Sequence, residues 1–329
     1  DRTSRGLGDV YKRQSHNRYE LMSEEIYKNI AESIIQSSTP NIDLEKQLSI
    51  DNFTRGLDAF SLYNSIYLEI IAYEEDVSKQ DQSATLLGAF NHHHLESQKI
   101  LTNSIFQSFC GNYNIAYSLL RSFIECHMRG VFLNQLALSQ HESGLWKAKL
   151  SSAVLDSYGG LIDQLKNYRA NRDKILDNVQ FLDMISGLKQ ELSFSDLLKE
   201  LISWELTYPE ESYPNFRNYS RYNKLSGYAH SEEKTHDISR LKKYFGNDDQ
   251  KAVISESMVV PQLTKEYLSD MCCIVDSSMV VMFNFISKVL TFEFSGFQDY
   301  IADLKDDDRF TNARLNYCTK WLSAYLSSD

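Results

Sequence analysis

The chain has 329 residues and a formal net charge of −11 at pH 7. Its length allows a large buried core, and its acidity disfavours general binding to nucleic acid or anionic membranes while leaving a local basic site open. Only 4 prolines and 13 glycines interrupt long runs of helix-forming residues, so we predict an all-α fold, an antiparallel multi-helix bundle with long helices.

The first fourteen residues differ in character from the rest. The letters DVYKRQ at 9–14 resemble the translation of a transposon-end adapter used in sequencing libraries, and SRGLG at 4–8 fits the bases just upstream. We expect residues 1–14 to be non-native. They carry a net charge of +2, so the remainder carries −13. The alternative is a basic tail that binds nucleic acid or an acidic partner.

Four helical patterns fill the first part of the chain. They are predicted at about 19–36, 44–77, 83–109 and 112–138, with Pro40 and Gly111 as breaks. Aromatic and aliphatic residues recur within them at three- and four-residue spacing, which indicates one buried face per helix. We predict one large domain over 15–329, with its bundle core at about 44–138 plus 180–291.

The later part of the chain is less regular. Shorter helices are predicted at 145–155 and 159–176, a further helix at 194–206, a loop at 207–216 and a helix across 218–233. Two late helices, 262–291 and 296–326, are expected to close the chain. The segment 271–290 has the length of a membrane span, but Asp276, Asn284 and Lys288 interrupt it, which favours a buried core helix.

Cysteine and histidine spacing gives no metal or cofactor prediction. The five cysteines form no CxxC pair, and their odd number favours a reducing, cytoplasmic location. In the run at 91–97, consecutive helical side chains diverge, and only His92 and Glu96 share a face. The sequence therefore indicates a solvated histidine patch rather than a metal site.

A polar stripe with local positive charge marks the helix predicted at 218–233. Residues 215–243 hold seven basic and three acidic side chains, a net charge of +4 on an acidic protein, which is typical of a phosphate-contacting site. The alternative is a satisfied histidine on a solvated helix. The stripe itself has i, i+4, i+7 and i+11 spacing and consists of Tyr219, Asn223, Ser226 and His230, with Lys224 beside it.

The fourth helix supplies the second candidate. With Leu120 at the centre of the apolar face, His127 is expected to face the core as a neutral, hydrogen-bonded imidazole. Arg121 and Glu125 form an i, i+4 pair on one flank, where Arg121 can reach a groove between helices. The alternative for this pair is a surface ion pair that contributes ~0.3 to 0.5 kcal/mol.

The combination of LLRxxxE at 119–125 with YxxLSxYAH at 222–230 resembles uncharacterised bacterial helical families and, more distantly, the HEPN superfamily. The resemblance covers about 100–235. It implies a metal-independent RNA endonuclease or an antitoxin-controlled toxin of phage defence, with His230 as proton donor or polariser and a cation beside the scissile phosphate. HEPN proteins carry an Arg four to six residues before the His, whereas Arg221 lies nine residues before His230. Arg121 can replace it only if the two helices touch.

Two functional hypotheses follow. The first is a HEPN-like RNA-cleaving or nucleotide-binding protein, with His230, Arg121 and Glu125 as catalytic residues. Its predicted substrate-binding residues are Tyr219, Asn223, Ser226 and Lys224. The second is a non-catalytic helical interaction protein in which the same polar groups form a buried network. RNA or a nucleotide, a second copy of the chain and an antitoxin-type protein are the expected partners; no cofactor and no membrane association are expected.

Overall fold

The computed structural model describes residues 51, 53–68, 88–139, 150–170, 192–207, 225–228, 260–290 and 295–326. Every regular element within these ranges is a helix, and none of them contains a strand. The all-α prediction is confirmed. The described residues exclude the helix predicted at 19–36, the loop predicted at 207–216 apart from Thr207, and most of the helix predicted at 218–233.

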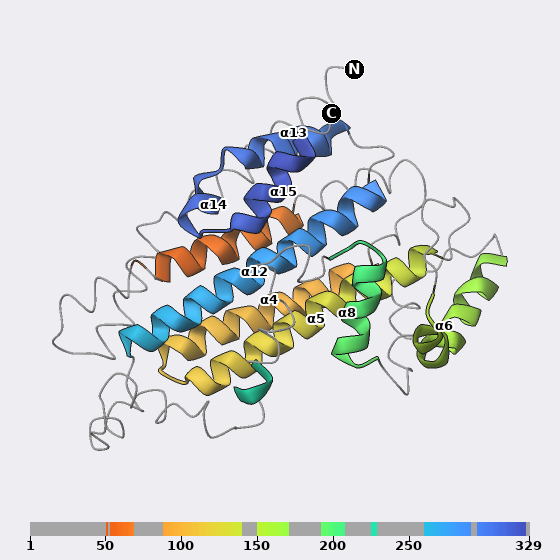
Figure 1. Cartoon of the computed structure of the whole chain (residues 1–329), viewed down its shortest axis with the longest axis horizontal. Coiled ribbons are helices and arrows are strands. Elements are labelled where there is room, and N and C mark those ends of the chain that lie inside the picture. The colour runs from red at the N-terminus through yellow and green to blue at the C-terminus, as the bar shows by residue number, and fades with distance from the viewer. Residues whose placement is uncertain are drawn as a thin grey trace, which may run out of the picture.

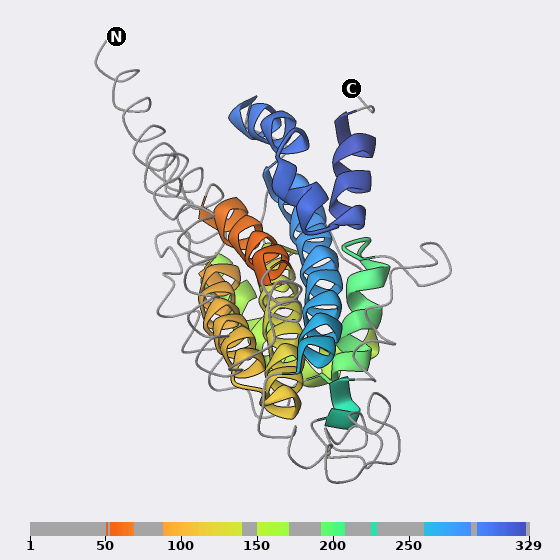
Figure 2. The same cartoon turned by 90° about the vertical axis from the view of Figure 1, so that its left-hand side faces the viewer.

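Four long helices surround one apolar core. They are the helix at 53–68, α4 (Gly88–Phe109), α5 (Tyr113–Ser139) and α12 (Pro261–Leu290), and Figures 1 and 2 show their axes running roughly side by side. A tight turn joins α4 to α5 and makes them antiparallel. Gly111 allows this turn because its φ is 79°, a left-handed conformation that favours glycine.

The apolar stripe predicted on α5 faces the core. Leu120 and the stripe residues around it are almost completely buried, and so is His127. Gly130 of α5 lies against α4, because a Cβ built at this position would approach the Cβ of His93 to 2.6 Å. The sequence pattern therefore identified the inward face of this helix correctly; its buried members are Tyr113, Ala116, Leu120, Ile124 and Val131.

The helices between α5 and α12 differ in part from the prediction. Instead of helices at 145–155 and 159–176, one helix, α6 (Ser152–Ala170), runs through Gly159 and Gly160. Nothing lies within 4 Å of a Cβ built at either glycine, so the two positions are ordinary helix positions beside open space. The helix predicted at 194–206 is present as α8 (Phe194–Ser203), with Ser193 as its N-cap.

The single helix predicted at 296–326 is wrong. Three helices occupy this stretch: α13 (Ser295–Lys305), α14 (Asp308–Asn312) and α15 (Asn316–Leu326). The first break occurs where Asp307 accepts a hydrogen bond from the backbone N–H of Arg309 and caps α14. The second occurs at Arg314, whose φ is 56°. Both breaks let the chain fold back beside α12 (Figure 1).

The polar residues that interrupt α12 connect it to other helices. Asp276 accepts hydrogen bonds from the backbone N–H groups of Tyr317 (2.9 Å) and Cys318 (2.8 Å) at the start of α15. The Asn284 amide donates to the carbonyl of Leu206 and accepts from the indole Nε1 of Trp321. Within the described residues, one stretch, Gln262–Ser287, has the length and hydropathy of a membrane span. Of its most apolar window, 89% is buried inside the protein. This helix is a core helix of the bundle.

Candidate functional site

One face of α5 carries a continuous polar stripe at the edge of the buried surface. Its members are spaced i, i+4, i+7, i+11 and i+15, so they fall within one narrow sector of the helix. Each is half-buried, and the exposed Ser122 lies on the adjoining sector. The stripe consists of Asn114, Ser118, Arg121, Glu125 and Arg129.

The centre of the stripe is an ion pair. Arg121 Nε donates to Glu125 Oε1 over 3.0 Å, and the two side chains retain 22% and 31% of their exposure. Both groups are thus accessible from solvent but partly desolvated, which strengthens their interaction with a ligand charge relative to a fully exposed pair. With Arg129 one turn further on, the stripe holds two cations and one anion.

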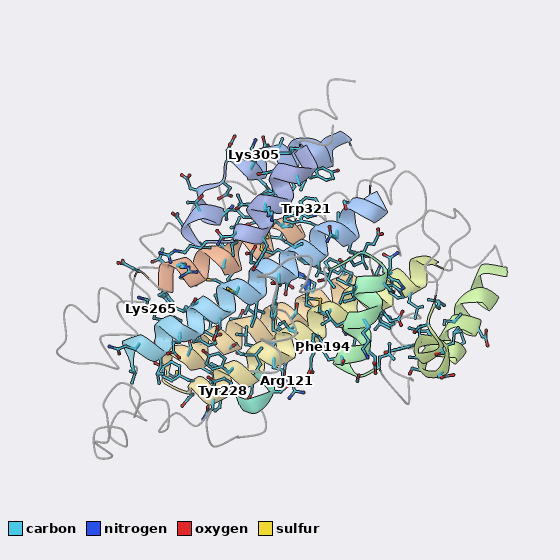
Figure 3. The ribbon with its side chains drawn as sticks, viewed as in Figure 1. Arg121, Phe194, Tyr228, Lys265, Lys305 and Trp321 are labelled. Atoms are coloured by element: carbon cyan, nitrogen blue, oxygen red, sulfur yellow. The ribbon has the colours of Figure 1, made fainter. Side chains whose placement is uncertain are left out.

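A short helical segment at 225–228 packs on α5 beside this pair. The rings of Tyr228 and Tyr117 are stacked, with centroids 4.1 Å apart and planes 8° from parallel. Tyr117 precedes Arg121 by one helical turn, and its hydroxyl donates to Asp270 of α12 over 3.0 Å. Figure 3 shows Arg121 and Tyr228 at the same edge of the molecule. The described part of the YxxLSxYAH motif, 225–228, therefore contacts α5 one helical turn before Arg121 of LLRxxxE.

The predicted site residues divide into two groups. Arg121 and Glu125 form the ion pair, and Ser226 is half-buried in the segment that touches α5. The other predicted residues lie outside the described part of the chain: His230, Tyr219, Asn223 and Lys224. Their positions relative to Arg121 remain sequence-based predictions.

His127 faces the core, as predicted, and is bonded at both ring nitrogens. Its Nε2 lies 3.0 Å from the carbonyl oxygen of Ser278, and its Nδ1 lies 2.7 Å from the hydroxyl of Tyr63. Burial lowers the pKa of His127 to about 4, although the hydrogen bond to Ser278 raises it. This imidazole is neutral at pH 7.

The interpretation of 91–97 as a solvated histidine patch is wrong for His94. Only 1% of this side chain is exposed, and its ring is stacked on Tyr67 (centroids 3.7 Å apart) and Tyr63 (4.5 Å). Burial, followed by the nearby His127, lowers its pKa well below the ordinary value. His92 is exposed and His93 is half-buried, so the three rings point in different directions. Among the described residues, no three His, Cys, Asp or Glu side chains group as metal ligands.

Sequence reasoning missed two members of the site. Arg129 has the same spacing as Arg121 and Glu125, and extending the stripe by one turn would have found it. Arg129 also lies near Cys126, where its charge lowers the thiol pKa while burial and Glu96 raise it to about 11. Tyr117 gives no such signal, because a tyrosine on a buried face reads as core packing.

Comparison with protein-family models, curated protein sequences and solved structures finds no match for this chain.

Proposed function

We propose that the chain is a HEPN-like RNA-cleaving or nucleotide-binding protein of bacterial defence or toxin type that acts in the cytoplasm. We place its site at the polar stripe of α5 together with the predicted residues of 219–230. The observation that supports this proposal is the stacking of Tyr228 on Tyr117, which precedes Arg121 by one helical turn.

Each residue has a distinct role in this proposal. In RNA cleavage the 2′-hydroxyl loses its proton to water as its oxygen bonds to the neighbouring phosphorus, and the bond from phosphorus to the 5′-oxygen breaks as that oxygen takes up a proton. His230 donates that proton, and Arg121 offsets the negative charge that accumulates on the phosphate oxygens. Glu125 orients the guanidinium of Arg121 through the 3.0 Å hydrogen bond. The remaining predicted contacts hold the substrate: Tyr219, Asn223, Lys224 and Ser226.

The proposal is tested by incubating single-stranded RNA with the full chain in the presence of a chelator. Arg121→Gln and His230→Ala are expected to reduce cleavage at least 100-fold, since each removes a group that acts in the transition state. Lys99→Gln is the matched control, because Lys99 is also the cation of an intrahelical ion pair but is 72% exposed on α4. Circular dichroism confirms that each variant is folded. Cleavage that survives in Arg121→Gln would reject the catalytic assignment.

A second candidate is a non-catalytic helical interaction protein, in which polar groups inside the bundle determine how the helices pair. The observation that favours it is that the Tyr63 hydroxyl contacts both Ser97 Oγ (3.0 Å) and Nδ1 of His127 (2.7 Å) in the core. If this second function is correct, the parent protein neither cuts nor binds RNA, and His230→Ala lowers the unfolding temperature. The two functions are thus separated by the same set of variants.

A further inference from the structure

A buried chain of hydrogen bonds crosses the bundle and joins its four central helices. From α4, Ser97 Oγ donates to the His94 carbonyl (2.8 Å) and lies 3.0 Å from the Tyr63 hydroxyl of helix 53–68. That hydroxyl is 2.7 Å from Nδ1 of His127 on α5, and Nε2 of His127 is 3.0 Å from the Ser278 carbonyl on α12. The four side-chain and carbonyl contacts are all buried.

Counting protons shows that this chain is one short when His127 is neutral. A carbonyl only accepts, so the contact with Ser278 requires a proton on Nε2 of His127. Nδ1 then accepts from Tyr63, which leaves the single hydroxyl proton of Ser97 to serve both Tyr63 and the carbonyl of His94. Four contacts share three protons, and one of them is necessarily incomplete.

A proton added to Nδ1 of His127 completes the chain without moving a heavy atom. His127 then donates to Tyr63, Tyr63 turns its hydroxyl to donate to Ser97, and Ser97 donates to the His94 carbonyl. Only the Tyr63 hydroxyl reverses, because Ser97 donates to the His94 carbonyl in both states, and each of the four contacts then holds its own proton. Burial opposes this charge, whereas the two acceptors that face the imidazolium favour it.

We propose that the Ser97–Tyr63–His127–Ser278 chain is a proton-binding switch: one proton enters at Nδ1 of His127 inside the folded bundle and reverses the Tyr63 hydroxyl. This inference is independent of the proposed RNA site.

The groups that surround His127 allow one added proton in this cluster, but not a second. Helix 53–68 contributes Tyr63, a phenol whose pKa burial raises, and the nearby phenol Tyr67. Cys126 of α5 is a thiol whose pKa burial raises to about 11, and α12 presents the carbonyl of Ser278. From α4, the His94 ring lies 6.4 Å away, centroid to centroid, and a charge on either ring opposes a charge on the other. A second proton is therefore disfavoured while the bundle is folded.

The test is an NMR titration of the full chain labelled with ¹⁵N in its histidines, with His127 assigned through His127→Gln. At pH 8 we expect the Nε2–H tautomer, and on acidification a reversible shift of both ring nitrogens to the imidazolium positions, with its midpoint between pH 4 and 6.5. The amide or circular dichroism spectrum of the same samples shows whether the bundle remains folded. A His127 ring that stays neutral until the protein unfolds overturns the proposal.

Tyr63→Phe separates a proton switch from a merely packed histidine. It keeps the ring but removes the acceptor for the Nδ1 proton, so the midpoint of His127 is expected to fall by one pH unit or more, a tenfold loss of proton affinity. Tyr67→Phe is the matched control, since Tyr67 stacks on His94 in the same cluster, whereas the two ring nitrogens of His127 lie against Tyr63 and Ser278. Equal midpoints in the parent and in Tyr63→Phe would contradict the proposed chain.

Discussion

Single buried ionisable residues give this fold opposing responses to pH. His127 has its folded-state pKa lowered to about 4 by burial, so its contribution to stability is complete above the unfolded value of 6.5 and is lost as the pH falls to about 4. Asp276 has its pKa raised to about 6 by burial, despite two backbone N–H donors. The contribution of Asp276 to stability is complete below pH 3.8, the ordinary pKa of an aspartate, and is lost as the pH rises through 6. Each effect amounts to about 3 kcal/mol, with opposite signs.

We therefore predict that the variant Asp276→Asn loses stability more steeply than the parent between pH 6.5 and 4, by up to about 3 kcal/mol, because only the histidine effect remains. His127→Gln is expected to deviate from the parent in the opposite direction. Urea unfolding at half-unit pH steps measures both slopes. Parallel pH profiles for all three proteins would contradict the assignment of these two groups.

Two glycine positions give opposite responses to one substitution. Gly160→Ala is expected to stabilise the protein by about 0.5 to 1 kcal/mol, because alanine has the better helix propensity and its Cβ meets open space in α6. Gly130→Ala is expected to destabilise it by about 1 to 3 kcal/mol, because its Cβ would clash with the Cβ of His93 and force α4 and α5 apart. Thermal unfolding of both variants provides the comparison, and a Gly130→Ala variant as stable as the parent would rule out the close approach.

At the scale of the helices, a side chain of α12 holds the C-terminal helices in place. Asp276 supplies both acceptors for the first N–H groups of α15, in the position that a local N-cap would normally take. Asp276→Ala is expected to cost about 3 kcal/mol, since it leaves the buried N–H of Cys318 and the half-buried N–H of Tyr317 without this acceptor. Asp303→Ala, which removes an exposed carboxylate of α13, serves as the control and is expected to change the free energy of unfolding by less than about 0.5 kcal/mol.

Hydrogen exchange distinguishes a local effect from a global one. In Asp276→Ala the amides of α15 are expected to exchange faster than those of α5, because the lost bonds lie at the α12–α15 contact. Uniform acceleration in every helix would instead mean that Asp276 stabilises the whole bundle without a specific role in capping α15.

The sequence predicted helices well where one apolar face extended over many turns, as in α4, α5 and α12. It failed where local hydrogen bonds competed with the helix: Asp307 and Arg314 divide the stretch predicted at 296–326 into three. It also placed a boundary at Gly159, although glycine is tolerated in a helix at a small energetic cost. The spacing of hydrophobic residues does not show where a side-chain cap or a turn ends a helix, nor where a glycine is accommodated within one.

At the scale of the whole molecule, the candidate site depends on contacts between distant parts of the chain. The flank position of Arg121 and Glu125 and the inward position of His127 follow from helical spacing alone. The Tyr117–Tyr228 stack, the burial of His94 and the capping of α15 by Asp276 do not, because each is determined by which helices pack together. The sequence thus indicates which residues share one face of a helix, but not which other helix packs against that face.

Ultraviolet crosslinking of a uridine-rich single-stranded RNA to the full chain, followed by mapping of the crosslinked peptides, tests the location of the proposed site. We predict crosslinks within 114–129 of α5 and within 219–230, and their loss in Arg121→Gln but not in Lys99→Gln. Crosslinks confined to other helices, or an absence of crosslinks from a folded protein, would mean that these two motifs do not form one RNA site.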